Sequence, residues 1–249
     1  MNRMDAAEIL QLLATGELEL EGYLPWSSNY TFLARVCADL DEVKAVYKPR
    51  RGERPLWDFV QGTLYRRERA AFLVSKALGW DLVPPTVLRD GPHGPGSLQL
   101  FIEHDPEIHY FTFEGHPRFR RPLQQIALLD MVINNADRKG GHVLLEETGD
   151  PTHPDRVWAI DHGVCFHSNY KLRTVIWEFS GQPIPPPLLA DLAALKTKLS
   201  GNEEDLLFQL RQLLTGVEVT ALQQRVARLL KQGRFWEPGV GRHYPWPPV

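Results

Sequence analysis

The sequence predicts an α+β protein of two lobes, a β-rich lobe over residues 1–103 and a helical lobe over residues 104–249. Before residue 103, β-branched and aromatic residues gather in short runs separated by turn residues, which is typical of strands. Beyond about residue 105, apolar residues recur at helical spacing. The chain has 249 residues, of which 43% are hydrophobic and 24% are charged. These values are those of soluble globular proteins, and they exclude a disordered chain, a collagen and a coiled coil.

The first lobe is predicted to begin with a short helix over residues 5–14. Three strands follow, separated by the turn residues 25–29 and 39–42, and short turns of this kind join antiparallel neighbours. We therefore expect an antiparallel meander, with strands at Leu18–Leu24, Tyr30–Val36 and Val43–Lys48.

An amphipathic helix is expected over Tyr65–Leu78, because apolar residues recur there every three or four positions and Gly79 ends the pattern. After it, Val83–Leu88 and Leu98–Ile102 indicate a second hairpin, whose turn is the Gly- and Pro-rich stretch 90–96. These elements complete the first lobe.

The second lobe is predicted to be mainly helical. Pro122 suits the first turn of a helix, and the apolar face of that helix carries one acid, Asp130. Val143–Glu147 and Val157–Asp161 are expected to form a short hairpin. Three more helices are expected near residues 187–199, 203–214 and 218–232.

Charge and cysteine content narrow the class of protein. The net charge is −3, with no basic excess to suggest a nucleic-acid partner. The two cysteines, Cys37 and Cys165, do not form a disulfide framework and favour a reducing, cytoplasmic location. The first residues lack the pattern of a signal peptide, and no run of about 18 apolar residues predicts a membrane span.

Two stretches concentrate polar groups that can carry chemistry, Asn134–His142 and Ala159–Gly163. If the strands on either side pair about a centre near residue 152, His142 and Asp161 become cross-strand neighbours, and Asp137 lies on the loop just before. Two carboxylates and an imidazole in this arrangement suit a divalent cation and a hydroxyl nucleophile. The alternative from spacing alone is that Asp137 caps a turn and Asp161 pairs with a surface arginine.

A second pair of residues favours the chemical interpretation. Lys48 ends an apolar strand, and Glu68 is the one acid of the helix that follows. Kinases hold a strand lysine against nucleotide phosphates with a glutamate of the next helix. The order of elements is the stronger observation: hairpin, Lys strand, Glu helix, connector, helix, Asp loop, hairpin, and then Asp-x-Gly.

This order and several local phrases resemble the phosphatidylinositol 3-/4-kinase-related superfamily, in particular type II phosphatidylinositol 4-kinases and HipA-like kinases, and a bacterial family labelled as kinase-related. The resemblance covers about residues 22–166 and implies a bilobal, protein-kinase-like and phosphatidylinositol-kinase-like fold. It rests on five short stretches in the same order: Ala45–Pro49, Arg67–Val74, Val83–Thr86, Asn134–Arg138 and Ala159–Gly163.

The resemblance implies roles for residues of the first lobe. Lys48 would contact the ATP phosphates, and Glu68 would orient it. The turn that covers the phosphates would hold Ser27, Ser28 and Asn29, although it carries no Gly-rich pattern. The connector whose backbone meets adenine would consist of Gln99, Leu100, Phe101 and Ile102.

In the second lobe, the resemblance implies that Asp137 positions the acceptor hydroxyl and that Asp161 binds Mg²⁺. The family commonly has Asn where this chain has His142. Because a neutral imidazole prefers Mn²⁺ to Mg²⁺ more than an amide does, we expect a shift towards Mn²⁺. Metal-dependent binding is expected to weaken as the pH falls through about 6.5, the ordinary pKa of His.

The remaining candidates support or compete with this scheme. Lys171 and Arg173 lie where kinases select acceptors, or they solubilise a loop, while Asp130 and Arg138 are expected to support the Asp137 loop. The expected function is a kinase that moves the γ-phosphoryl group of ATP to a hydroxyl of a protein or small molecule. A nucleotide-binding pseudokinase with a regulatory role is the first alternative. A metal-dependent hydrolase is the second, with its ligands drawn from His104, Asp105, Glu107, His109 and His116.

Overall fold

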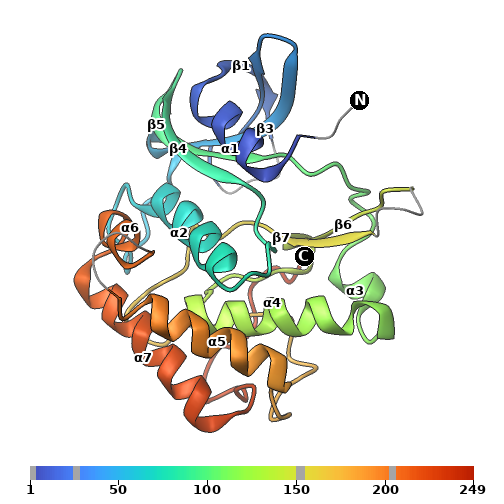
Figure 1. Ribbon diagram of the computed structural model, residues 1–249, viewed down its shortest axis with the longest axis vertical. Coiled ribbons are helices and arrows are strands. Elements are labelled where there is room, and N and C mark those ends of the chain that lie inside the picture. Colours follow the sequence, from blue (N-terminus) through green and yellow to red (C-terminus); the bar gives the residue numbers. More distant parts are fainter. Residues whose placement is uncertain (1–3, 25–28, 150–154, 202–205) are drawn as a thin grey trace.

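A computed structural model describes residues 4–24, 29–149, 155–201 and 206–249. A five-stranded sheet with one helix above it lies over a larger helical part (Figure 1). All neighbouring strands are antiparallel, in the order β1-β2-β3-β5-β4. The strands are β1 (Glu17–Tyr23), β2 (Phe32–Ala38), β3 (Asp41–Pro49), β4 (Thr86–Gly91) and β5 (Gly94–Leu100), and the helix above them is α1 (Ala6–Thr15).

The predicted meander is present, with strand ends that differ by a few residues. The turn between β2 and β3 is tight because Ala38 pairs with Asp41, which leaves Asp39 and Leu40 between the strands. Asp39 adopts a left-handed backbone (φ 53°), which Asp tolerates better than most residues and which tight hairpin turns require.

The two faces of β3 have different partners. Ala45 and Tyr47 are fully buried in a cluster that includes Leu12 and Leu13 of α1. Alternation along the strand turns Lys48 to the opposite face, towards the helical part. A capping box between Asp5 and Glu8 fixes the start of α1. Because α1 packs on one face of β3, the opposite face of this strand is the one that faces the site.

The second hairpin is also present, but its turn is shorter than expected. β4 continues to Gly91 and β5 begins at Gly94, so that only Pro92 and His93 lie between the strands. Gly94 has φ 91°, a conformation that favours glycine. The expected start of β5 at Leu98 is therefore four residues late.

The helical part packs around α4 (Figure 1). Its core joins residues of α2 to those of α4, α5, α6 and α7, so that α2 belongs to both parts of the molecule. The division at residue 103 stays a prediction. The elements are α2 (Leu64–Ala77), α3 (Tyr110–Phe113), α4 (Arg120–Ile133), α5 (Pro186–Lys198), α6 (Leu206–Leu213), α7 (Gly216–Gln232), the strands β6 (Val143–Glu146) and β7 (Arg156–Ala159), and the 3₁₀ turns η1 (Arg50–Gly52), η2 (Pro117–Phe119) and η3 (Gly140–His142).

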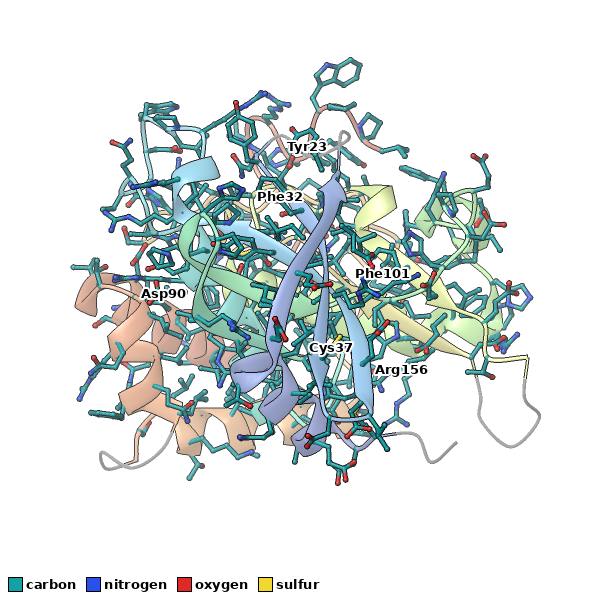
Figure 2. The ribbon with its side chains drawn as sticks, turned by 90° about the horizontal axis from the view of Figure 1, so that it is seen from above. Tyr23, Phe32, Cys37, Asp90, Phe101 and Arg156 are labelled. Atoms are coloured by element: carbon teal, nitrogen blue, oxygen red, sulfur yellow. The ribbon has the colours of Figure 1, made fainter. Side chains whose placement is uncertain are left out.

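The sheet side of the molecule carries side chains from both parts. Figure 2 looks onto this side, with Tyr23 at the end of β1, Phe101 just beyond β5, and Arg156 from the β6–β7 hairpin. In the portion of the chain that the structure describes, no helix has the length and apolar character needed to cross a membrane.

The contact between α1 and the sheet generates a stability prediction. Leu13 is fully buried and Leu40 is 99% exposed. Leu13→Ala should lower the free energy of unfolding by about 2–5 kcal/mol, because it leaves a cavity, while Leu40→Ala should change it by less than about 0.5 kcal/mol. Urea denaturation of both variants measures the difference. Equal midpoints would show that α1 does not stabilise the sheet.

Candidate active site

Lys48 lies at the centre of the site, between two carboxylates. Its Nζ is 2.5 Å from Glu68 Oε1 and 3.1 Å from Asp161 Oδ1. The predicted ion pair between Lys48 and Glu68 is thus confirmed. Asp161 comes from a segment 113 residues further along the chain, so this one ammonium links the sheet, α2 and the segment after β7.

Glu68 and Asp161 are held in place by the backbone around them. The second Glu68 oxygen accepts a hydrogen bond from the His162 amide at 2.9 Å, and the Glu68 side chain is only 3% exposed. Asp161 has a left-handed backbone (φ 58°). Asp tolerates this conformation better than most residues, and it occurs directly before His162, whose amide donates to Glu68.

The charges of this cluster stabilise one another. Burial disfavours the Lys48 ammonium, but the Asp161 and Glu68 carboxylates outweigh that effect and raise its pKa above the ordinary value. Burial likewise disfavours ionisation of Asp161, but Lys48 and His142 hold its pKa well below the usual range. Lys48 is therefore a cation and Asp161 an anion at neutral pH.

His142 faces Asp161, as the hairpin geometry predicts, although the register differs slightly. The Ile160 amide donates to the His142 carbonyl at 3.0 Å, and Val143 pairs with Ala159. His142 therefore lies opposite Ile160, and the pairing centre is residue 151 rather than 152. The His142 Nε2 atom is still 3.3 Å from Asp161 Oδ2, so the side chains meet where the expected cross-strand neighbours would.

The prediction that protonation of His142 weakens metal-dependent binding near pH 6.5 is wrong. Burial lowers the pKa of His142 to about 4, and the opposing effect of Asp161 is smaller. The imidazole is therefore neutral at pH 6.5, and its protonation cannot weaken metal binding there. A pH effect that depends on His142 moves to about pH 4.

The donor set formed by His142 and Asp161 fits a divalent cation. His142 Nδ1 is 3.0 Å from the Asp137 carbonyl oxygen; when Nδ1 carries the proton and donates to that oxygen, the Nε2 lone pair is free to face Asp161. Metal-binding histidines are commonly oriented in this way. Within the described ranges, no three His, Cys, Asp or Glu side chains gather as a metal site. The two residues would hold a cation only together with phosphate oxygens or water, which is how Mg²⁺ is bound in kinases.

Asp137 lies on the loop between α4 and β6, and its carboxylate is 37% exposed. The loop is fixed because the Asp137 amide donates to the Asn135 side chain at 2.9 Å. Burial raises the pKa of Asp137 to about 6; the Lys139 ammonium lowers it, and the Asp161 carboxylate adds to the increase. A carboxylate with a pKa near the working pH can accept a proton from a hydroxyl.

Asp130 and Arg138 form a fully buried ion pair beneath this loop, with 3.0 Å between Arg138 Nη2 and Asp130 Oδ1. The guanidinium also donates to the carbonyls of His142 (3.1 Å) and Ile160 (2.7 Å) and contacts His162 Nε2 at 2.7 Å. The expected hydrogen bonds from the Asp137 loop to Asp130 are present. This pair links three parts of the site, namely α4, the turn that ends at His142, and the segment after β7.

Sequence reasoning missed the anchoring role of Asn134 and Asn135. The Asn134 amide group donates to the carbonyls of His167 (2.8 Å) and Asn169 (2.7 Å), and its oxygen accepts from the Lys171 amide at 2.9 Å. Asn135 donates to Asp130 at 2.9 Å. Both asparagines are fully buried. Two amides directly after an apolar helix were the available signal, because buried amides need several partners.

The residues expected around the nucleotide are only partly brought together. Ser27 and Ser28 lie outside the described residues. Asn29 lines a cavity of about 60 Å³ beside Lys48, Glu68 and Asp161. Lys48, Glu68 and Asp161 therefore open onto one cavity.

The connector begins later than predicted. Gln99 and Leu100 belong to β5, where the Gln99 side chain bonds Thr86 and the Leu100 amide donates to Pro85. The Phe101 amide donates to the Lys44 carbonyl at 3.0 Å. Strand pairing thus occupies backbone groups expected to meet adenine. Chain that is free of the sheet starts at Ile102.

The alternative metal site of a hydrolase is not formed. His104 lies 2.7 Å from the Ile102 carbonyl, Asp105 accepts from the Glu107 amide, and His116 accepts from the Arg118 amide. All of residues 104–116 are described, and they hold no group of three metal-binding side chains. These residues stabilise local turns instead.

The comparisons with known proteins agree with this geometry. The family model for phosphatidylinositol 3- and 4-kinase matches residues 88–216, slightly more than half of the chain. The chain belongs to this kinase family. The matched stretch contains Asp130, Asp137 and Asp161 but begins after Lys48 and Glu68, whose pairing is seen in the structure.

Two relatives illustrate the range of the likeness. Protein Rv2133c of Mycobacterium tuberculosis is 38% identical over 95% of this chain and 94% of that protein. Phosphatidylinositol 4-kinase gamma 4 of Oryza sativa subsp. japonica is 29% identical over 47% of this chain, but the match covers only 22% of the plant protein. The matched half of this chain therefore corresponds to about a fifth of the plant protein.

Among solved structures, the Golgi casein kinase with Mn/ADP bound has a TM-score of 0.62 and 16% identity, covering 91% of this chain and 75% of that one. At this identity the likeness concerns the fold alone. The predicted bilobal, kinase-like α+β fold is thus confirmed. Fold and family together indicate a phosphotransferase.

The buried pair beneath the Asp137 loop generates a prediction. Arg138→Met should lower the free energy of unfolding by about 3–5 kcal/mol, because it leaves the Asp130 carboxylate buried without a partner. Arg118 pairs with Asp155 at the surface, its side chain 54% exposed, so Arg118→Met should cost about 1 kcal/mol or less. Chemical denaturation measures both. A similar loss in the two variants would contradict a central role for Arg138.

The raised pKa of Asp137 generates a second prediction. Because its pKa is about 6 in the folded protein and about 3.9 when unfolded, the folded state binds the proton more tightly, and ionisation destabilises it above pH 6. Asp137→Asn should therefore raise the urea midpoint at pH 8, and the gain should disappear as the pH falls from 6 to 4.

The measurement uses protein without nucleotide or metal. Asp155 is the matched control, because hydrogen bonds from the Thr148 amide and Arg118 lower its pKa. Its stabilising effect is present above pH 4, so that Asp155→Asn should lower the midpoint at pH 8. An Asp137→Asn midpoint that stays below that of the unsubstituted protein at pH 8 would contradict the raised pKa.

Proposed function

We propose that the protein is an ATP-dependent kinase that transfers the γ-phosphoryl group to a hydroxyl of a small molecule or protein. The observation that supports this most directly is the Lys48 ammonium between Glu68 and Asp161. A lysine fixed by one carboxylate and placed next to a second, metal-binding carboxylate meets the requirement of phosphoryl transfer for concentrated positive charge at the phosphates.

In this proposal each residue has one task. Lys48 pairs with the phosphates, and Glu68 keeps it from turning into solvent. Asp161 and His142 would hold Mg²⁺ or Mn²⁺, which neutralises charge on the phosphate oxygens when bound. Asp137 accepts the proton of the attacking hydroxyl, and it is ionised above about pH 6. Adenine would contact the backbone from Ile102 onward, because β5 ends at Leu100.

One observation favours the pseudokinase alternative. The site offers two protein ligands for a cation, and one of them is the imidazole of His142 rather than an oxygen ligand. Imidazole is a poorer ligand for Mg²⁺ than for Mn²⁺ or Zn²⁺. Binding of nucleotide without transfer would favour that alternative, so the test must read the two events separately.

Two substitutions separate binding from transfer. Asp161→Asn should weaken ADP binding in the presence of Mn²⁺ by about tenfold or more, because a charge-assisted contact is lost. Asp137→Asn should leave that binding within about twofold but lower the transfer rate by about a hundredfold or more, because the proton acceptor is lost. Calorimetry with Mn²⁺ and ADP, and release of ADP from ATP, measure the two effects.

Lys196→Gln, at an exposed position of α5, is the matched control and should change neither quantity. Equal loss of ADP affinity in the Asp161 and Asp137 variants would contradict the separate roles. Tight ADP binding together with no transfer to any acceptor would favour the pseudokinase.

A further inference from the structure

A second cavity adjoins the site on the side of Asp137. It has a volume of about 320 Å³, compared with about 60 Å³ for the cavity at Lys48. Asn29, Leu64, Asp137 and Val164 line both cavities, which makes them neighbours. The larger cavity lacks Lys48 and Asp161 in its lining. It therefore lies where an acceptor, rather than the phosphates, would approach Asp137.

The charges around this cavity are mainly positive. Arg54, Lys171 and Arg173 line it together with only two carboxylates, Asp58 and Asp137. Lys171 Nζ is 2.7 Å from Asp58 Oδ2, and both side chains are about 15% exposed, so these two charges neutralise each other. Asp137 is half-buried, and in residues 4–24, 29–149, 155–201 and 206–249 the one cation within 4.0 Å of its carboxylate is Lys139.

In the part of the chain that the structure describes, the guanidinium groups of Arg54 and Arg173 remain without a partner; Arg54 is exposed, whereas Arg173 is half-buried. Among the residues that the structure describes, the Arg173 guanidinium makes no hydrogen bond or ion pair, although its charge acts on Asp137. A half-buried guanidinium beside a reactive carboxylate, with no carboxylate of its own, is suited to an anionic group of a ligand.

The position of Arg173 is fixed by the Asp137 loop itself. Its amide donates to the Asn135 carbonyl at 2.9 Å, and its carbonyl accepts from the Arg138 amide at 3.0 Å. The Lys171 amide is held by Asn134. Because these bonds join Arg173 to residues on either side of Asp137, the backbone keeps the two residues next to each other.

An aromatic ring stands at the same cavity. Trp57, on the loop of residues 53–63, is 93% exposed, with Lys171 Nζ 5.2 Å from its ring centre. The loop is anchored before Trp57 by the Arg54 amide, which donates to Asn29 Oδ1 at 2.8 Å. After Trp57, the Asp58 carbonyl is 2.9 Å from His167 Nε2, and the Phe59 ring centre is 4.8 Å from the Arg67 guanidinium. An indole that is open to solvent beside a cavity with both apolar and charged lining can cover the apolar face of a sugar or polyol ring.

We propose that this cavity is the acceptor site and that the acceptor is a small, soluble sugar or polyol with a phosphate or carboxylate group. The anionic group pairs with Arg173, the ring packs on Trp57, and a free hydroxyl faces Asp137. The hydroxyl oxygen forms a bond to the γ-phosphorus of ATP, the bond to the ADP oxygen breaks, and the hydroxyl proton passes to Asp137. This inference rests on the kinase function proposed above.

The test measures ADP release and product formation with the full chain, ATP and Mn²⁺. The anionic probes are glucose 6-phosphate, glycerol 3-phosphate and gluconate, and their neutral counterparts are glucose and glycerol. Two further arms contain phosphatidylinositol in phosphatidylcholine vesicles and an acidic serine peptide. We expect kcat/KM for at least one anionic probe to exceed that of its neutral counterpart by about tenfold or more, the effect of one charge-assisted contact.

Arg173→Gln should reduce this preference by about tenfold through a higher acceptor KM, with ADP affinity unchanged, because only the anion contact is lost. Arg118→Gln, at the distant surface pair, is the matched control and should behave as the unsubstituted protein. Equal use of neutral and anionic probes, transfer confined to the vesicles or the peptide, or no transfer to the anionic probes despite ADP binding would overturn the inference. Absence of ADP binding would instead remove the proposed kinase function and this inference with it.

Discussion

The buried guanidinium of Arg138 is the interaction on which the arrangement of the site depends. All five of its N–H donors have acceptors, on Asp130, on His162 and on the carbonyls of His142 and Ile160. Each acceptor is on, or directly beside, a segment that carries a functional side chain. Full satisfaction of the donors offsets the cost of removing this charge from water. The buried Arg138 cation, rather than the functional side chains themselves, therefore fixes the position of the site.

The Lys48 cluster carries more negative than positive charge. Lys48 is shared between Glu68 and Asp161, and the neutral imidazole of His142 adds no charge. Two carboxylates thus face one ammonium, while Asp137 has the Lys139 ammonium at 4.0 Å. In the proposed kinase, a nucleotide brings further negative charge, which a divalent cation beside Asp161 would offset. The charge balance of the protein itself thus explains why metal and nucleotide would bind together.

Local patterns in the sequence predicted the parts of the molecule that local physics controls. Alternation placed Lys48 on a strand, helical spacing placed Glu68 on the next helix, and their order predicted the pair that the structure shows. The anchoring by Asn134 and the orientation of the loop of residues 53–63 were not predictable, because they depend on contacts between segments more than 30 residues apart. The ordinary pKa assumed for His142 failed for the same reason, since burial is a tertiary property.

The two cavities share a wall. In the proposed kinase, this limits which substitutions can change the preference for an acceptor without affecting transfer. Asp137 belongs to both, and backbone hydrogen bonds tie its loop to Arg173 on one side and to Val164 on the other. A shift of the segment around Arg173 would therefore move Asp137 and, in the proposed kinase, disturb transfer. Substitution of side chains that line only the larger cavity, such as Trp57 or Arg173, leaves that backbone in place. Acceptor preference in a chain with this fold should change through those side chains, while the Asp130–Arg138 pair and the Lys48 cluster stay the same.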